Sequence, residues 1–142
     1  MSRLEKLEIL LNKIEREFTD IYVAAAEAVK KKRVRKYVFR SSEKVFWTVI
    51  GKEGKEYITT SWVREGNIIY ACSCPDYLFH AMLKTRAEKI NRRNFCYHIV
   101  ARIISEINEL RRDLGHKYNE SALPTIIRLD ERSIKTFLKR FT

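Results

Sequence analysis

The sequence predicts a small α+β protein, in which an antiparallel β-meander packs with helices and a long amphipathic helix comes first. Three observations predict this class. Residues 37–72 hold β-branched and aromatic runs, and glycine-containing turns follow the second and the third of them. Apolar residues at helical spacing occupy the segments before and after that region. Hydrophobic residues make up 45% of the 142, enough to bury the core of one ordinary domain.

The first element is an amphipathic helix from residue 2 to about residue 30. Ser2 followed by Glu5 has the spacing of a capping box. Apolar residues then alternate at intervals of three and four: Leu4, Leu7, Leu11, Ile14, Phe18, Ile21, Ala25 and Ala28. This stripe has two interpretations. It packs on its own domain, or its first four residues bind a protein partner or a second copy as a coiled-coil seam.

A basic run follows the helix and is expected to link it to the first strand. The segment 30–36 contains six basic residues: Lys30, Lys31, Lys32, Arg33, Arg35 and Lys36. The whole chain carries a formal charge of +11. Such an excess favours nucleic acid as a partner, because each phosphate that a cation neutralises releases counterions. An anionic membrane surface and an acidic protein are lesser options, and a solvated linker is the structural alternative for the run itself.

Four strands are expected at 37–39, 45–50, 57–63 and 67–71, with turns at 51–54 and 64–67. Three aromatic residues in this region are interpreted as core: Trp47, Trp62 and Tyr70. If one face of the sheet is open, they are instead placed to stack on unpaired bases.

Two pairs of metal-ligand residues flank the last strand and the next helix. Cys72 and Cys74 lie two apart, so a strand end would present both sulfurs to one side. Cys96 and His98 fall in the first turn of an apolar-periodic helix, where a thiolate is favoured. Three cysteines and one histidine form a common structural zinc set. Four protein ligands leave no position for a catalytic water.

Other assignments of these four residues remain open. Each cysteine alone fits a small buried side chain, and the histidine fits a helix position. A disulfide is a weaker alternative, since three cysteines cannot all pair within one chain. His80 and His116 compete with His98 as the fourth ligand.

The region from about residue 55 to 115 resembles the SWIM-type zinc finger. In that family a hairpin carries Cys-x-Cys, a variable insert follows, and Cys-x-His opens a helix. Here Cys-Ser-Cys-Pro-Asp-Tyr occupies 72–77, and Ile-Val-Ala follows His98. The resemblance implies one structural Zn²⁺ in a ββα site, and a role in binding DNA or other proteins.

The remaining segments add a second basic candidate and a final helix. The insert 76–94 is expected to form a short helix with a basic tip, in which Arg92 and Arg93 are candidates for nucleic-acid contact. Its structural alternative is an exposed loop. The helix from Cys96 ends at Gly115. Asp130 is an expected N-cap for a C-terminal amphipathic helix.

Together these features divide the chain into three parts: 1–36, the helix and basic linker; 37–116, the meander with the zinc finger; and 117–142, the C-terminal segment. We expect a zinc protein that binds DNA or RNA. We expect it to be non-enzymatic, because no Gly-rich phosphate loop, nucleophile elbow or H-E-x-x-H motif occurs. The alternatives are a protein-interaction adaptor and a component of a large RNA assembly such as the ribosome. We expect a reducing, cytoplasmic location (nuclear if the host has a nucleus) and no membrane span.

Overall fold

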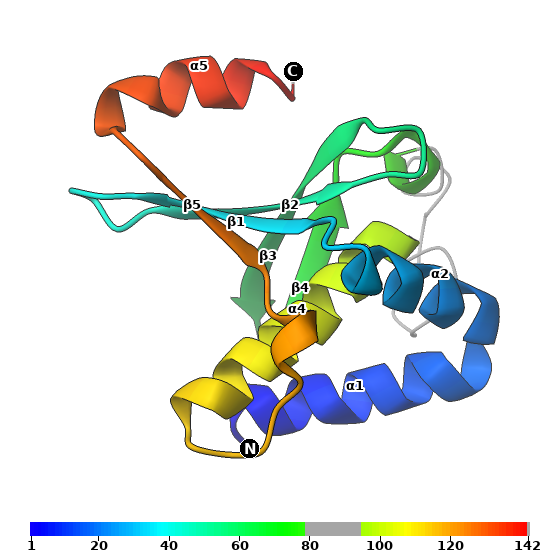
Figure 1. Ribbon diagram of the computed structural model, residues 1–142. Coiled ribbons are helices and arrows are strands. Elements are labelled where there is room, and N and C mark those ends of the chain that lie inside the picture. Colours follow the sequence, from blue (N-terminus) through cyan, green and yellow to red (C-terminus); the bar gives the residue numbers. More distant parts are fainter. Residues whose placement is uncertain (79–94, 142) are drawn as a thin grey trace.

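The computed structural model describes residues 1–78 and 95–141 (Figure 1). It confirms the α+β class, since helices cover the faces of one five-stranded sheet. The tip of the insert, with Arg92 and Arg93, lies outside the described residues. Within residues 1–78 and 95–141, every helix is too short or too polar to cross a bilayer.

Four of the five strands form the expected antiparallel meander. They are β1 (Val34–Phe39), β2 (Val45–Ile50), β3 (Glu56–Arg64) and β4 (Asn67–Cys72). The β3–β4 hairpin closes through Glu65 and Gly66, whose φ angles are 52° and 79°. Positive φ at both central residues is the geometry of a tight two-residue hairpin.

A fifth strand, β5 (Thr125–Leu129), pairs in parallel with β1 and completes the order β4-β3-β2-β1-β5. This strand is not among the four expected from the sequence. The C-terminal segment therefore adds an edge to the same sheet. It continues through η3 (Glu131–Ser133), which Asp130 caps, into α5 (Ile134–Lys139).

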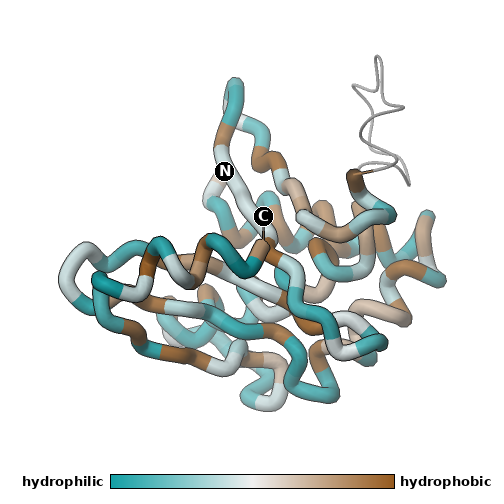
Figure 2. The backbone as a smooth tube through the Cα atoms, turned by 90° about the horizontal axis from the view of Figure 1, so that it is seen from above, coloured by the Kyte–Doolittle hydropathy of each residue, from teal (hydrophilic) through white to brown (hydrophobic). Residues whose placement is uncertain are grey.

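Helices cover the two faces unequally (Figures 1 and 2). On one face lie α1 (Arg3–Glu17), α2 (Thr19–Lys30) and α4 (Tyr97–Asp113). They bury two apolar clusters against the sheet, one of which includes all three cysteines. On the other face, α5 packs Phe137 against Tyr37 and Phe39.

The prediction of one helix from residue 2 to about 30 was wrong. The capping box at Ser2 is present, but α1 ends at Glu17, and the next residue, Phe18, has a non-helical φ of −131° and ψ of 55°. Packing explains the break. A straight helix of that length would extend roughly 43 Å, whereas α4 spans only about 26 Å. Two shorter helices can both pack along α4, as α1 and α2 do.

The apolar stripe of α1 faces the chain's own core. Leu7 and Ile14 are fully buried, Leu4 is 5% exposed and Leu11 is partly buried. These four residues were the candidates for a coiled-coil seam. Because their side chains already pack inside this chain, that interpretation needs correction in favour of packing within the domain.

Candidate metal centre

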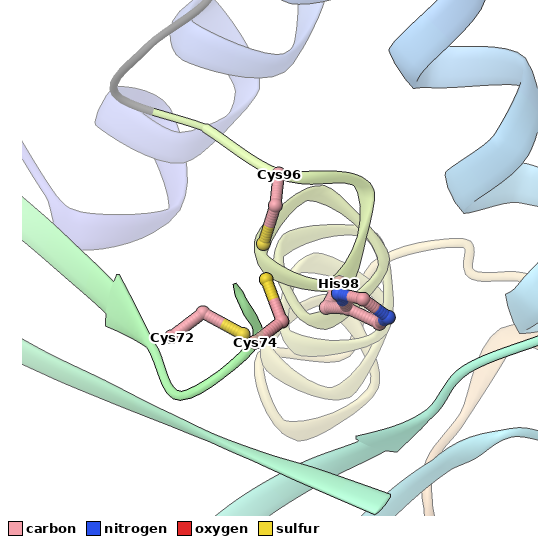
Figure 3. A group of neighbouring side chains, drawn as sticks. All are labelled: Cys72, Cys74, Cys96 and His98. Atoms are coloured by element: carbon pink, nitrogen blue, oxygen red, sulfur yellow. The ribbon is translucent and has the colours of Figure 1, made fainter. Parts of the chain in front are cut away.

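Four side chains from two distant parts of the chain converge in Figure 3: Cys72, Cys74, Cys96 and His98. Cys72 is the last residue of β4, and Cys74 follows two residues later. Cys96 is the N-cap of α4, and His98 lies in its first turn. One ligand atom from each residue lies within 4.8 Å of the others. Among the described residues, this is the single cluster with metal-binding geometry.

The local backbone explains how Cys72 and Cys74, at the end of β4, direct their sulfurs toward the same cluster. Ser73 continues the pairing with β3, because its amide donates to the Ile58 carbonyl and its hydroxyl accepts from the Ile58 amide, both at 3.0 Å. The chain then turns, and residues 75–78 are helical. The Tyr77 amide donates to Cys74 Sγ at 3.3 Å. Cys74 therefore accepts a hydrogen bond as an N-cap side chain would.

Burial supports a metal at this cluster. All four side chains are buried, with exposed fractions from 1% to 7%. Both ring nitrogens of His98 are buried and lack a hydrogen-bond partner among the described residues. Leaving such polar atoms unsatisfied costs about 1–3 kcal/mol each. A cation bound between the sulfurs and one ring nitrogen would satisfy that nitrogen, so the residues present fit a metal.

The electrostatics of the three thiols also favour a cation. Hydrogen bonds donated by Cys72 and Cys96 lower the pKa of the Cys74 thiol. The hydrogen bond to Cys74 raises the pKa of Cys72 to about 12, and burial raises the pKa of Cys96. The pocket therefore favours one thiolate and resists three. A divalent ion would offset the repulsion that three neighbouring thiolates create.

The β2–β3 turn, residues 51–55, closes over the histidine. A Cβ atom built on Gly51 would lie 3.2 Å from His98 Nε2 and 3.2 Å from the Tyr57 ring. The Lys52 amide donates to the Tyr97 hydroxyl at 3.1 Å. The rings of Tyr97 and Tyr57 lie 4.0 and 4.8 Å from the His98 ring. Sequence reasoning identified Gly51 only as a turn residue and missed this contact.

The rival fourth ligands are not part of the cluster that the structure describes. His116 lies in an exposed loop after α4 and is absent from the four-residue group. His80 falls outside the described residues. No disulfide joins the three cysteines.

The basic run is not a uniform linker, because two of its six residues lie in a strand. Arg35 and Lys36 belong to β1. Lys36 Nζ lies 2.7 Å from Glu109 and stacks over the Trp47 ring, and its side chain is only 20% exposed. Arg35 Nη1 lies 3.8 Å from the Glu56 carboxylate. Both cations already have acidic partners inside the fold, which leaves them poorly placed for phosphate.

The first part of the run stays at the surface. Lys30 ends α2, Lys31 pairs with Glu27 at 2.9 Å, and Lys32 Nζ donates to the Ser121 carbonyl at 2.6 Å. The Arg33 carbonyl accepts a hydrogen bond from the Ile50 amide, which joins this segment to the β2–β3 turn.

That hydrogen bond places further lysines near the run. Lys52 and Lys55 of the β2–β3 turn lie over the rings of Tyr97 and Tyr57, at 5.7 Å from each centroid. We use the term basic surface for Lys30, Lys31, Arg33, Lys52 and Lys55. It adjoins the metal centre, because the same turn contacts His98. Glu27 and Glu53 are its acidic neighbours.

A curated protein of Dictyostelium discoideum, named zinc finger SWIM domain-containing protein 7 homolog, is 30% identical to this chain over 90 residues. The match covers 63% of this chain and 50% of that protein, so the chain spans about half the length of the relative it matches. No protein-family model and no solved structure matches. The similarity and the Cys₃His cluster together support a zinc-finger-like metal site.

Proposed function

We propose that this chain is a non-enzymatic zinc protein that binds nucleic acid, DNA or RNA, through contacts to phosphates. Cys72, Cys74, Cys96 and His98 would hold one structural Zn²⁺. The convergence of these four buried donors carries the proposal. Four protein ligands fill a tetrahedral zinc site, so the metal would supply folding energy and no reactive water.

The metal would tie together elements that are far apart in sequence. Cys72 ends β4 and Cys74 follows it, whereas Cys96 caps α4 and His98 lies in its first turn. The β2–β3 turn packs on the histidine and carries two lysines of the basic surface. A bound zinc would therefore fix the position of those lysines relative to α2.

The charge distribution supports nucleic acid as the partner. The formal charge is +11, and several acidic groups are already paired within the fold. Glu106 bonds Arg3, Glu109 bonds Lys36, and Glu56 lies against Arg140. The basic surface also has carboxylate neighbours: Glu27 pairs with Lys31, and Asp20 lines one pocket together with Lys52. Binding through such cations would be insensitive to base sequence and steeply dependent on salt.

A charge-neutralised variant tests this proposal. Replacing Lys30, Lys31 and Arg33 by Gln should weaken binding to oligonucleotides of unrelated sequence alike. The slope of log affinity against log salt should become shallower by about 0.7–0.9 for each phosphate that the variant no longer neutralises. Fluorescence anisotropy at several salt concentrations gives both quantities.

The matched control neutralises three exposed cations elsewhere: Lys117, Arg128 and Lys135. It removes the same charge from a different part of the surface and should change the slope less. An equal loss of affinity in the control would mean that binding depends on the net charge of the protein and not on the basic surface. A loss confined to one sequence would contradict phosphate contact.

The adaptor alternative uses the N-terminal helix together with the zinc module, and it is less favoured because Leu7 and Ile14 of that helix are buried within this chain. The other alternative, a component of a large RNA assembly, also requires the chain to bind nucleic acid. Running the anisotropy series with RNA and DNA of the same sequence distinguishes it from a preference for DNA.

A further inference from the structure

Among the described residues, 1–78 and 95–141, the helix α5 covers only part of the width of the sheet face on which it lies. The aromatic cluster under α5 draws on β1, β2, β5 and the start of β3: Tyr37, Phe39, Phe46, Ile58, Ile127, Leu129, Ile134, Phe137 and Phe141. No residue of β4 belongs to it, and none of β3 beyond Ile58. Figure 1 shows α5 above the side of the sheet that β1 and β5 form.

Trp62 lies on the uncovered part of this face. Side chains alternate between faces along a strand, so Trp62 shares the face of Ile58, which packs under α5. The intervening residues point the other way. Thr59 bonds Arg102 of α4, and Ser61 bonds Arg3 of α1. The Trp62 indole therefore points away from these helices.

The three aromatic residues of the meander differ sharply in exposure. Trp47 and Tyr70 are buried, at 6% and 4%, whereas Trp62 is 47% exposed. Ile69 lies opposite Trp62 on β4, and Ala71 lies opposite Thr60. Among the described residues, Trp62 is thus a large flat ring on a mixed polar and apolar surface. The core interpretation holds for the first two residues and fails for Trp62.

Resting on the proposed function, we propose that Trp62 is a stacking platform for unpaired bases of a single-stranded nucleic acid. Open antiparallel sheets with exposed aromatic residues are one way that proteins bind single strands. Bases within a duplex stack on one another and do not offer a free face. A protein partner is less favoured, because polar residues (Thr60, Arg64 and Asn67) interrupt the apolar neighbours of the indole, Ile69 and Ala71, among the described residues.

The charges nearest this position are few and partly engaged. Arg64 and Glu65 lie side by side at the hairpin tip, and Lys6 Nζ donates to the Gly66 carbonyl there at 2.6 Å. Stacking, and not phosphate attraction, would therefore supply the contribution of Trp62. This separates it from the basic surface, whose contribution should fall as salt rises.

Trp62→Ala tests the proposal in the full-length chain with an oligothymidine of about 16 nucleotides as the probe. Loss of one stacked base should weaken binding between about 5-fold and 100-fold. The slope of log affinity against log salt should stay the same. Trp62→Phe keeps an aromatic face and should retain most of the affinity. Binding to a duplex of matched length should be the same in the wild type and the alanine variant.

Intrinsic fluorescence gives a second readout from the unmodified protein. Oligothymidine should quench the exposed Trp62, while the buried Trp47 supplies an unquenched baseline. Trp62→Ala should remove the quenching, and its zinc content should equal that of the wild type.

The outcomes separate this inference from the proposal beneath it. Unchanged oligothymidine affinity in Trp62→Ala, or an equal loss on single strand and duplex, would overturn the stacking role. If the charge-neutralised variant nevertheless binds nucleic acid more weakly than the wild type, the proposal that this chain binds nucleic acid stands. A wild type that binds neither probe would overturn both.

Discussion

A single glycine controls how closely the chain packs on the histidine of the metal centre. Gly51 approaches His98 Nε2 so closely that an added methyl group would sit 3.2 Å away, with the Tyr57 ring equally near. That distance is tighter than ordinary van der Waals contact, so the ring or the turn must shift. Outer contacts of this kind orient metal ligands.

Gly51→Ala should therefore weaken zinc binding, by about 10-fold to 100-fold if it acts as typical outer contacts do. Competition with a chromophoric chelator measures the affinity. Gly54→Ala is the matched control in the same turn. Gly54 has φ +86° and nothing within 4 Å of an added methyl group. The control should lose about 1–2 kcal/mol of stability through backbone strain and keep its zinc affinity. Equal zinc affinities in the two variants would contradict the role of Gly51.

The ligands themselves could be identified from the sequence, because each pair is local. Cys72 and Cys74 are two residues apart at a strand end, and Cys96 and His98 share one helical turn. Gly51 could not, since its contact with His98 joins positions 47 apart (98 − 51) through tertiary packing. The exposure of Trp62 could not be predicted either, because it depends on how much of the sheet face α5 covers.

Among the elements, α1 could have been either a coiled-coil seam or a helix packed on its own domain. Its stripe has the spacing of a coiled-coil seam, yet its side chains pack on α4 and β4 within the same chain. Period alone cannot distinguish these roles, because both bury one face of a helix.

Leu7→Ala should cost about 2–5 kcal/mol of unfolding free energy, because the side chain is fully buried and leaves a cavity. Ile9→Ala on the same helix is the control. Ile9 is 56% exposed, and its removal should cost under about 0.5 kcal/mol. Urea denaturation at two protein concentrations measures both. A cost for Leu7→Ala that depended on protein concentration would point to a seam between chains instead.

The sequence predicted the middle of the fold better than its ends. The meander was foreseeable because hairpin neighbours adjoin in sequence and two of its three turns carry glycine. The break at Phe18 and the strand β5 were not. The first follows from the length of α4, and the second from pairing with β1 about 90 residues earlier (125 − 35).

At the scale of the whole molecule, a buried polar network joins the sheet to its helices. Arg102 of α4 is 8% exposed, lies 3.4 Å from Glu106 and donates to the Thr59 carbonyl at 3.0 Å. Glu106 also accepts from Arg3 at 2.6 Å and from the Tyr70 hydroxyl at 3.1 Å. One carboxylate thus serves groups from α1, β4 and α4.

Glu106→Ala should destabilise the protein by about 3–5 kcal/mol, because it leaves the Arg102 guanidinium buried without its charge partner. Glu8→Ala is the control, since Glu8 pairs with Arg111 where both side chains are about one-third exposed. It should cost under about 1 kcal/mol. Thermal unfolding of the two variants measures the difference, and similar costs would show that the network adds no more than a surface pair.

Two parts of the fold would respond differently to metal loss. The cysteines lie within one apolar cluster with Leu7, Tyr70 and Ile99, whereas the cluster under α5 contains no ligand. A structural zinc should therefore stabilise the side of the sheet that carries α1 and α4, and that side should loosen first when the metal is removed.

Zinc content per chain shows whether Cys72, Cys74, Cys96 and His98 hold a structural metal. The protein should be purified under native conditions without added metal, and zinc measured by mass spectrometry of the elements for the wild type and Cys96→Ser. We expect one zinc per chain in the wild type, and loss of both zinc and folded structure in the variant. A wild type without zinc, or a variant that melts like the wild type, would contradict a structural metal centre at this cluster.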